Sequence, residues 1–240
     1  MKRLTRANTK AALKPRSANS HKGNHGHALI VAGSMGSMGA AVIAARACMR
    51  SGVGLLTVNV PEEERFILQT AIPEAMLVRR ENTAFDFNRF AAIGIGPGIG
   101  IDAVAINLLT DILEQSTKPL LLDADALKII ADHKTLLDKV PEQTILTPHP
   151  KEFERLFGIH KNAEDRTSTA IKKAKEHISK NNINQNTALK YIDIYAKNAS
   201  DVKSPSKWVT EILIPVQSAV VVPTPTVVTP PILAPEVITD

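Results

Sequence analysis

The sequence predicts an α/β fold in which a mostly parallel β-sheet carries helices on both faces. Between residue 26 and about residue 160, apolar β-branched stretches typical of buried strands alternate with stretches whose apolar residues have helical spacing. Turns rich in glycine or proline follow several of the strands. Alternation of this kind is typical of parallel sheets. The chain has 240 residues, 44% of them hydrophobic, which suffices for one such domain with tails.

We expect six strands and four helices in this region, and a fifth helix after it. The strands are expected at residues 27–32, 55–60, 75–78, 91–95, 119–122 and 144–146. The helices are expected at residues 40–51, 102–115, 124–132 and 151–157, and an amphipathic helix at 163–182. Ligands bind at the carboxyl ends of the strands in such a sheet, and the most unusual motifs of this sequence fall there.

Composition limits the possible partners. The net charge is +5, but the basic residues are scattered and aromatic residues make up only 4% of the chain, so we favour phosphorylated small molecules over nucleic acid. No apolar run approaches the length that crosses a membrane. The single cysteine, Cys48, excludes a disulfide framework and indicates a reducing compartment. We therefore expect a cytoplasmic protein with no nucleic-acid or membrane partner.

The first motif is the turn "GSMGSMGAA" at residues 33–41, between a strand and an apolar helix. No acidic residue occurs before Glu62, so this turn lies in a positive local field. The first N–H groups of a helix are unpaired, and glycines let a phosphate approach them closely. A phosphate site is one interpretation. The other is that the glycines only allow the strand and helix to pack closely, since no standard nucleotide fingerprint is present.

Three further motifs follow later strands. "GIGPGIG" at residues 94–100 presents bare backbone, although it could be merely a tight turn. In "LLLDADAL", Asp123 and Asp125 could hold Mg²⁺ through water, or Asp123 could cap the next helix. In "TILTPHPKEF", His149 stands between two prolines, which suggests either a ligand contact or a histidine packed in a loop.

These four motifs, in this order and spacing, resemble those of the ADP-dependent NAD(P)H-hydrate dehydratases of the ribokinase-like superfamily. The resemblance covers about residues 14–185 and implies a three-layer αβα domain, incomplete at its carboxy-terminal end. It implies that ADP or ATP, with Mg²⁺, phosphorylates the added hydroxyl of hydrated NADH or NADPH, and that loss of phosphate restores the reduced dinucleotide. This is a nicotinamide nucleotide repair reaction. Whether the protein forms a homo-oligomer stays open.

The resemblance also assigns residues. Four of them would contact the hydrated dinucleotide: Gly39, Ala40, Gly98 and His149. Asp123 and Asp125 fall in the motif near the metal and the phosphates. Family members continue through a strand ending in Lys-Gly and then a Gly-Ser-Gly-Asp motif, whose aspartate is the expected base. Here Tyr191 follows Lys190, and no glycine occurs after Gly158. The catalytic base is therefore unassigned, with Asp125 as a weak candidate, and we expect impaired turnover.

Two other functions stay open at this point. One is a nucleotide-binding remnant without turnover, favoured by the missing glycine loop. The other is a ribokinase-like kinase acting on a vitamin-type alcohol, which the first glycine turn and "TPHPKEF" disfavour.

The domain organisation follows from the same motifs. The resemblance implies that residues 26–185 form a truncated hydrate dehydratase domain. Residues 1–25 read as a basic linker or arm rather than a transit peptide, because no sustained amphipathic stripe occurs there. Residues 186–240 are rich in Val, Pro and Thr, and we expect a poorly ordered tail that arose from a wrong reading frame or a foreign junction. A real extension or surface anchor is the alternative.

Overall fold

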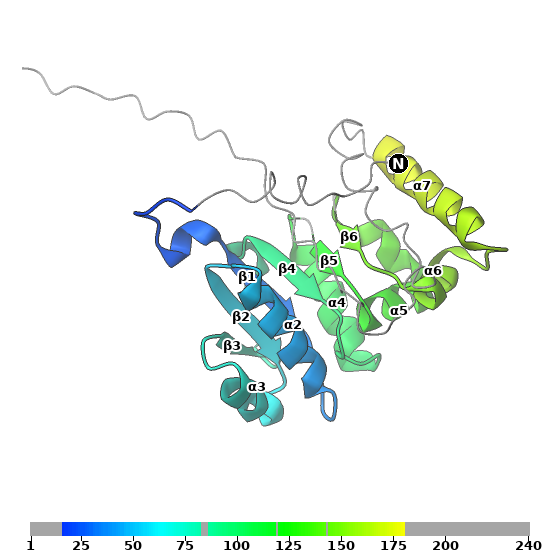
Figure 1. Ribbon diagram of the computed structural model, residues 1–240. Coiled ribbons are helices and arrows are strands. Elements are labelled where there is room, and N and C mark those ends of the chain that lie inside the picture. The colour runs from blue at the N-terminus through cyan, green and yellow to red at the C-terminus, as the bar shows by residue number, and fades with distance from the viewer. Residues whose placement is uncertain (1–15, 83–85, 119, 143, 181–240) are drawn as a thin grey trace, which may run out of the picture. The chain divides into compact units, whose positions relative to one another are not determined.

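The protein is described by a computed structural model that covers residues 16–82, 86–118, 120–142 and 144–180. Within these ranges the chain forms a six-stranded sheet in which every neighbouring pair is parallel, in the order β3-β2-β1-β4-β5-β6 (Figure 1). The strands are β1 (His27–Val31), β2 (Leu55–Val60), β3 (Met76–Arg79), β4 (Ala92–Ile95), β5 (Leu120–Leu122) and β6 (Ile145–Leu146). The predicted α/β class with a mostly parallel sheet is confirmed.

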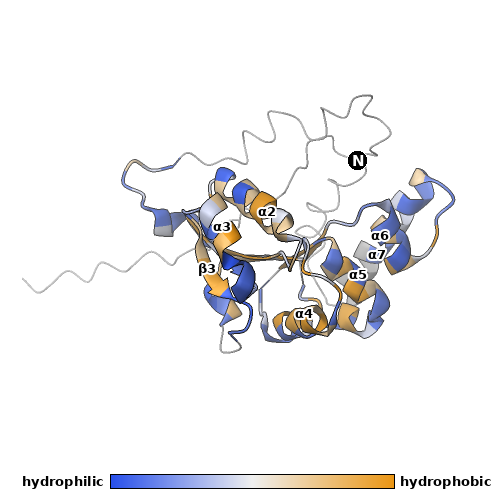
Figure 2. Ribbon diagram, turned by 90° about the horizontal axis from the view of Figure 1, so that it is seen from below, coloured by the Kyte–Doolittle hydropathy of each residue, from blue (hydrophilic) through white to orange (hydrophobic). Residues whose placement is uncertain are grey.

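Helices connect the strands on both faces of the sheet. The α-helices are α2 (Met38–Arg50), α3 (Arg65–Ala71), α4 (Ala103–Gln115), α5 (Asp125–Asp132), α6 (Pro150–Phe157) and α7 (Ala163–Lys180). Short 3₁₀ helices are η1 (Lys22–His25), η2 (Glu62–Glu64), η3 (Phe87–Arg89) and η4 (Lys134–Lys139). Figure 2 shows α2 and α3 on one side of the sheet and α4 on the other, which gives the expected three layers. No described helix is long and apolar enough to cross a membrane.

The strand order changes direction between β1 and β4. The chain runs from β1 outward through β2 to β3, and then returns to place β4 on the other side of β1, with Val31 opposite Ile95. Because all strands are parallel, the turns after β1 and β4 leave the same edge of the sheet as neighbours. A parallel sheet binds ligands at such a switch point, so the fold places both glycine-rich turns where a ligand is expected.

The core lies between the sheet and the helices. α4 buries four residues at helical spacing: Ala105, Leu109, Ile112 and Leu113. They pack in one cluster with strand residues such as Leu29, Ile95 and Leu122, which have no exposed surface. Burying one leucine or isoleucine side chain contributes about 1.5–3 kcal/mol to stability. The apolar runs that identify the strands therefore also supply most of the core.

α2 packs on β1 and β2 through a narrow stripe of mostly small side chains. Its buried residues are Met38, Ala41, Ala45 and Cys48. Burial raises the pKa of the Cys48 thiol to about 11, so this cysteine stays protonated at neutral pH and belongs to the core.

Most predicted boundaries differ from the structure by one residue. Two larger differences, the start of α2 and the presence of α3, have a clear cause. α2 begins at Met38 rather than residue 40, because Ser37 is its N-cap and Gly39 lies in the first turn. α3 was not predicted: it has only seven residues, buries only Leu68 and leaves Phe66 and Ile67 exposed, so no helical periodicity marks it. The predictions for residues 1–15 and 186–240 lie outside the described residues.

Gly96 offers a test of how closely the turns pack. It has a φ of +136°, and a Cβ there would lie 1.8 Å from the carbonyl oxygen of Asp123. We expect Gly96→Ala to lower the free energy of unfolding by about 3 kcal/mol or more, because the conformation is strained for alanine and the blocking atom is backbone. Chemical denaturation measures this loss.

Gly36 provides the matched control, since it has a φ of +74° and a Cβ there would meet no atom within 4 Å. Gly36→Ala should cost only the left-handed backbone penalty of about 1–2 kcal/mol. Equal losses in the two variants would contradict the close packing of Gly96 on Asp123.

Candidate functional site at the carboxyl edge of the sheet

The turn between β1 and α2 is fixed to the turn after β4 by a backbone hydrogen bond. The Gly33 N–H donates to the carbonyl oxygen of Pro97 over 2.9 Å. Gly33 has a φ of +75°, and a Cβ there would lie 2.7 Å from the Sδ of Met38. A Cβ at Gly39 would meet no atom within 4 Å. Close packing thus explains Gly33 but does not explain Gly39, which faces open space.

The amino end of α2 is not capped by a side chain. Ser37 is the N-cap residue, but its hydroxyl makes no capping hydrogen bond, and no acidic residue lies in the first turn. Backbone N–H groups and the positive end of the helix dipole therefore remain available to a negatively charged ligand.

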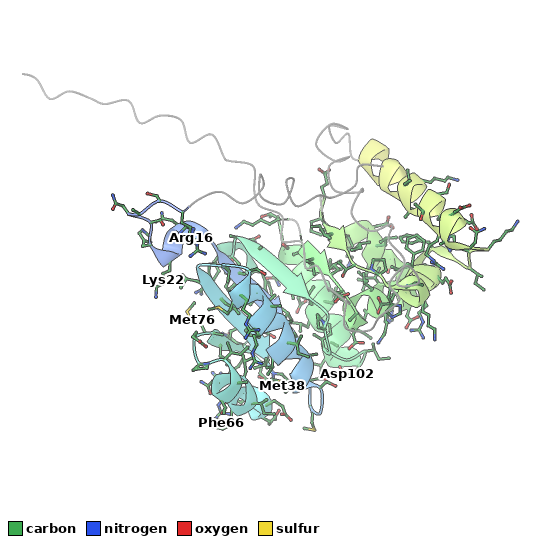
Figure 3. All side chains as sticks on the ribbon, in the orientation of Figure 1. Arg16, Lys22, Met38, Phe66, Met76 and Asp102 are labelled. Atoms are coloured by element: carbon green, nitrogen blue, oxygen red, sulfur yellow. The ribbon has the colours of Figure 1, made fainter. Side chains whose placement is uncertain are left out.

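The second glycine turn lies directly against this helix end. A Cβ at Gly98 would be 2.9 Å from the Cβ of Ala40 and 3.1 Å from the carbonyl oxygen of Ser37. The structure therefore brings together three of the residues expected to contact substrate: Gly39, Ala40 and Gly98. Figure 3 shows the same end of the domain, with Met38 in the first turn of α2 and Asp102 at the N-cap of α4, while Arg16 and Lys22 lie at the opposite end.

Asp123 and Asp125 follow β5 at the same edge. The prediction that Asp123 could cap the next helix is wrong: the N-cap of α5 is Ala124, and no side chain caps it. The Asp123 Oδ1 instead accepts a hydrogen bond of 2.8 Å from the Thr147 hydroxyl, which comes from the segment after β6. Ala124 has a φ of +48°, a strained conformation for a residue with a side chain.

Asp125 holds the second glycine turn in place. Its Oδ2 accepts the Gly100 N–H over 3.1 Å, and its Oδ1 accepts from the Lys128 ammonium over 2.6 Å. Both oxygens are already hydrogen-bonded in this arrangement, which makes Asp125 a poor candidate for a proton acceptor.

The two aspartates differ in their suitability for Mg²⁺. The described residues contain no group of three or more His, Cys, Asp or Glu side chains that could hold a metal ion. Mg²⁺ is often held by only one or two carboxylates together with substrate phosphates and water. Within the described ranges the Asp123 Oδ2 has no hydrogen-bond partner, so Asp123 fits such a role. Asp125 fits less well, because each of its oxygens already accepts a hydrogen bond.

His149 is the N-cap of α6. Its Nδ1 accepts from the N–H groups of Lys151 and Glu152 at 3.2 and 3.3 Å. The buried Glu152 carboxylate accepts a hydrogen bond of 3.0 Å from the backbone N–H of His149. Its other oxygen lies 3.1 Å from the Nε2 of the His149 ring. Both ring nitrogens are therefore engaged, while 58% of the side chain is exposed. The sequence predicted a stiffly held histidine, but not this capping role, although the His-x-x-Glu spacing is its signal.

No sequence pattern indicated a role for Arg80, which follows β3 and reaches across the edge to the first glycine turn. Its guanidinium donates to the carbonyl oxygens of Gly33 at 2.8 Å and Ala32 at 3.1 Å, and to the Asn59 Oδ1 at 3.2 Å. Burial lowers the pKa of Arg80 to about 10, against the opposing effect of the carboxylates of Glu81 and Asp102. Arg80 thus remains a cation at neutral pH. Its contacts depend on strand pairing, which the local sequence does not reveal.

Solved structures share this fold. A ribokinase-like superfamily protein from Enterococcus faecalis is 30% identical, with a TM-score of 0.59, and the match covers 66% of this chain and 58% of that protein. An ADP/ATP-dependent NAD(P)H-hydrate dehydratase from Bacillus subtilis, co-crystallised with ATP and Mg²⁺, is also 30% identical, with a TM-score of 0.58 over 75% of this chain and 63% of that one. The fold is therefore ribokinase-like.

The sequence comparisons give the family. The family model described as NAD(P)H-hydrate dehydratase matches residues 28–185. An ADP-dependent (S)-NAD(P)H-hydrate dehydratase from Listeria monocytogenes is 36% identical over 176 residues, 71% of this chain and 63% of the relative. A bifunctional NAD(P)H-hydrate repair enzyme from Moorella thermoacetica is 36% identical over 72% of this chain and 36% of its own length. The chain belongs to the NAD(P)H-hydrate dehydratase family, and it spans less than two thirds of these relatives.

The contacts of Asp125 predict its contribution to stability. Asp125→Ala removes the acceptor of the Gly100 N–H and the partner of Lys128 together, so we expect a loss of about 1–3 kcal/mol in the free energy of unfolding. Lys128→Met removes only the partly exposed ammonium and should cost about 1 kcal/mol or less. Urea denaturation compares the two variants. An equal loss would show that the bond to Gly100 contributes nothing.

Proposed function

We propose that this chain binds hydrated NADH or NADPH, with ADP or ATP, at the carboxyl edge between β1 and β4. The observation that carries the proposal is the contact of the two glycine turns, with Gly98 packed against Ala40 beside the uncapped start of α2. Backbone N–H groups there suit the phosphates of a dinucleotide. Family membership and the relatives named as hydrate dehydratases support the choice of ligand.

The proposed reaction is phosphorylation followed by elimination. The hydroxyl of the hydrated ring attacks the terminal phosphorus of ADP or ATP, its proton passes to a base, and AMP or ADP leaves. The C–O bond then breaks with loss of inorganic phosphate, the neighbouring carbon loses a proton, and the ring double bond of NADH or NADPH returns.

The residues of this chain have different parts in that reaction. Gly39, Ala40 and Gly98 would contact the dinucleotide through backbone and a small side chain. The His149 ring would contact it from the segment after β6, two strands from β4 in the sheet. Asp123 would lie near the phosphates and hold Mg²⁺ through its Oδ2, and the ion would neutralise charge that develops on the phosphoryl group.

We further propose that turnover by this chain is near background. Phosphoryl transfer depends on holding the nucleotide phosphates in line with the attacking hydroxyl. No glycine follows Gly158, so the chain lacks a Gly-Ser-Gly-Asp motif to hold those phosphates and supply the base. A nucleotide-binding remnant is therefore the second candidate function. A small-molecule kinase would need the same loop, so its absence counts equally against that alternative.

Substitution of His149 tests binding. His149→Ala removes both the cap of α6 and the proposed ring contact, whereas His149→Asn restores a good N-cap and lacks the ring. We expect both variants to bind NADPH about tenfold more weakly than the unmodified chain, a loss that corresponds to one ordinary contact. Isothermal titration calorimetry measures the dissociation constants. Wild-type affinity in His149→Asn would remove the ring from the site and leave only the capping role.

A direct assay tests turnover. Purified chain is mixed with hydrated NADH, ADP and Mg²⁺, and the return of absorbance by reduced nicotinamide is followed. Loss of a base alone commonly lowers a rate by about 10²–10⁴-fold, and loss of phosphate positioning lowers it further, so we expect activity at background. The Bacillus subtilis enzyme is the positive control. Turnover comparable to that enzyme would show that another group has replaced the missing base.

A further inference from the structure

Arg80 is placed where it can control the shape of the first glycine turn. Its own backbone N–H donates to the carbonyl oxygen of Val60 over 2.9 Å, which fixes its origin at the end of β2. From there the guanidinium extends past β2 to the carboxyl end of β1. It reaches the last carbonyl groups before the turn, those of Ala32 and Gly33.

These carbonyl groups need a partner. Ala32 is fully buried and Gly33 is buried, and a buried carbonyl without a hydrogen bond destabilises the fold. The planar guanidinium presents several N–H groups in fixed directions, so one side chain satisfies both oxygens and the Asn59 amide oxygen together. A lysine has the same charge but not this fixed fork of donors.

The charge of Arg80 is not neutralised by an ion pair. Among the described residues, no carboxylate oxygen lies within 4 Å of its guanidinium, although five Lys or Arg side chains in that part of the chain do pair with a carboxylate. Arg80 is partly buried, its hydrogen-bond partners are all neutral oxygens, and the carboxylates of Glu81 and Asp102 act on it only at longer range. Removing such a cation from water costs stability. This cost points to a role at the turn that it supports.

We propose that Arg80 is a positioning residue that holds the turn of residues 33–39 in the shape that receives the dinucleotide. The identity of the ligand in this inference rests on the proposed function. The effect of Arg80 on the shape of the turn does not. Arg80 contacts the backbone just before Gly39 and Ala40 and acts on the ligand through it.

The experiment compares Arg80→Met and Arg80→Lys with a matched control on the opposite edge. Lys118 donates to the carbonyl oxygens of Asn88 at 2.6 Å and Phe90 at 2.7 Å, so Lys118→Met also removes a partly buried cation that joins backbone carbonyls. Two quantities are measured for each variant: amide hydrogen exchange at Gly33, Ser37 and Ala40, and the dissociation constant of NADPH by calorimetry.

We expect both Arg80 variants to exchange these amides about tenfold faster and to bind NADPH about tenfold more weakly, because the open turn becomes more populated. Lys118→Met should lower the melting temperature and change neither quantity. If Arg80→Lys matches the wild type in both, charge rather than positioning matters and the inference is wrong. If the Arg80 variants lose only thermal stability, as Lys118→Met does, the role is merely structural and the inference also fails.

The two proposals fail in different ways. A wild-type chain that does not bind NADPH contradicts the proposed function. The exchange measurement then still decides the inference, since faster exchange confined to residues 33–40 supports it and unchanged exchange overturns it.

Discussion

The candidate site depends on backbone segments that approach one another more closely than side chains would allow. Gly96 packs on the carbonyl of Asp123, Gly98 packs on the carbonyl of Ser37, and the Gly33 N–H bonds to Pro97. These contacts join the turns after β1, β4 and β5 into one unit. Glycine therefore has two effects at this edge: it permits the close approach of the turns, and at Gly39 it leaves the backbone uncovered toward open space.

Polar side chains at this edge serve the fold before they serve a ligand. Arg80 supports the β1 and β2 side, and Asp125 supports the β4 and β5 side through the Gly100 N–H. The nitrogens of His149 are engaged within α6. The hydrogen bonds that hold these groups in place leave fewer of their donor and acceptor positions for a substrate proton. The described part of the edge is therefore better suited to hold a ligand through backbone groups than to perform acid–base chemistry.

The sequence predicted the strands well because buried parallel strands appear as short apolar runs, and the common edge followed from their being parallel. Neighbouring turns could thus be placed together before any coordinates. Contacts that depend on the register between strands could not be predicted from the sequence. Thr147 reaches Asp123 because β6 pairs with β5, and Arg80 reaches Gly33 because β3 pairs with β2. The prediction that Asp123 caps the next helix was wrong for the same reason. Its side chain bonds to Thr147, which is distant in sequence, and not to the first backbone N–H groups of α5.

In the proposed function, binding and phosphoryl transfer depend on different parts of this chain. Among the described residues, the contacts that shape the candidate site lie between Ala32 and Glu152. None of these contacts involves a residue after Gly158, and the family model matches the sequence only as far as residue 185. In the proposed function, a replaced phosphate loop removes the alignment of the nucleotide but leaves the dinucleotide turns intact. The proposed function therefore allows the chain to bind the dinucleotide without catalysing the reaction, because separate sets of contacts serve the two.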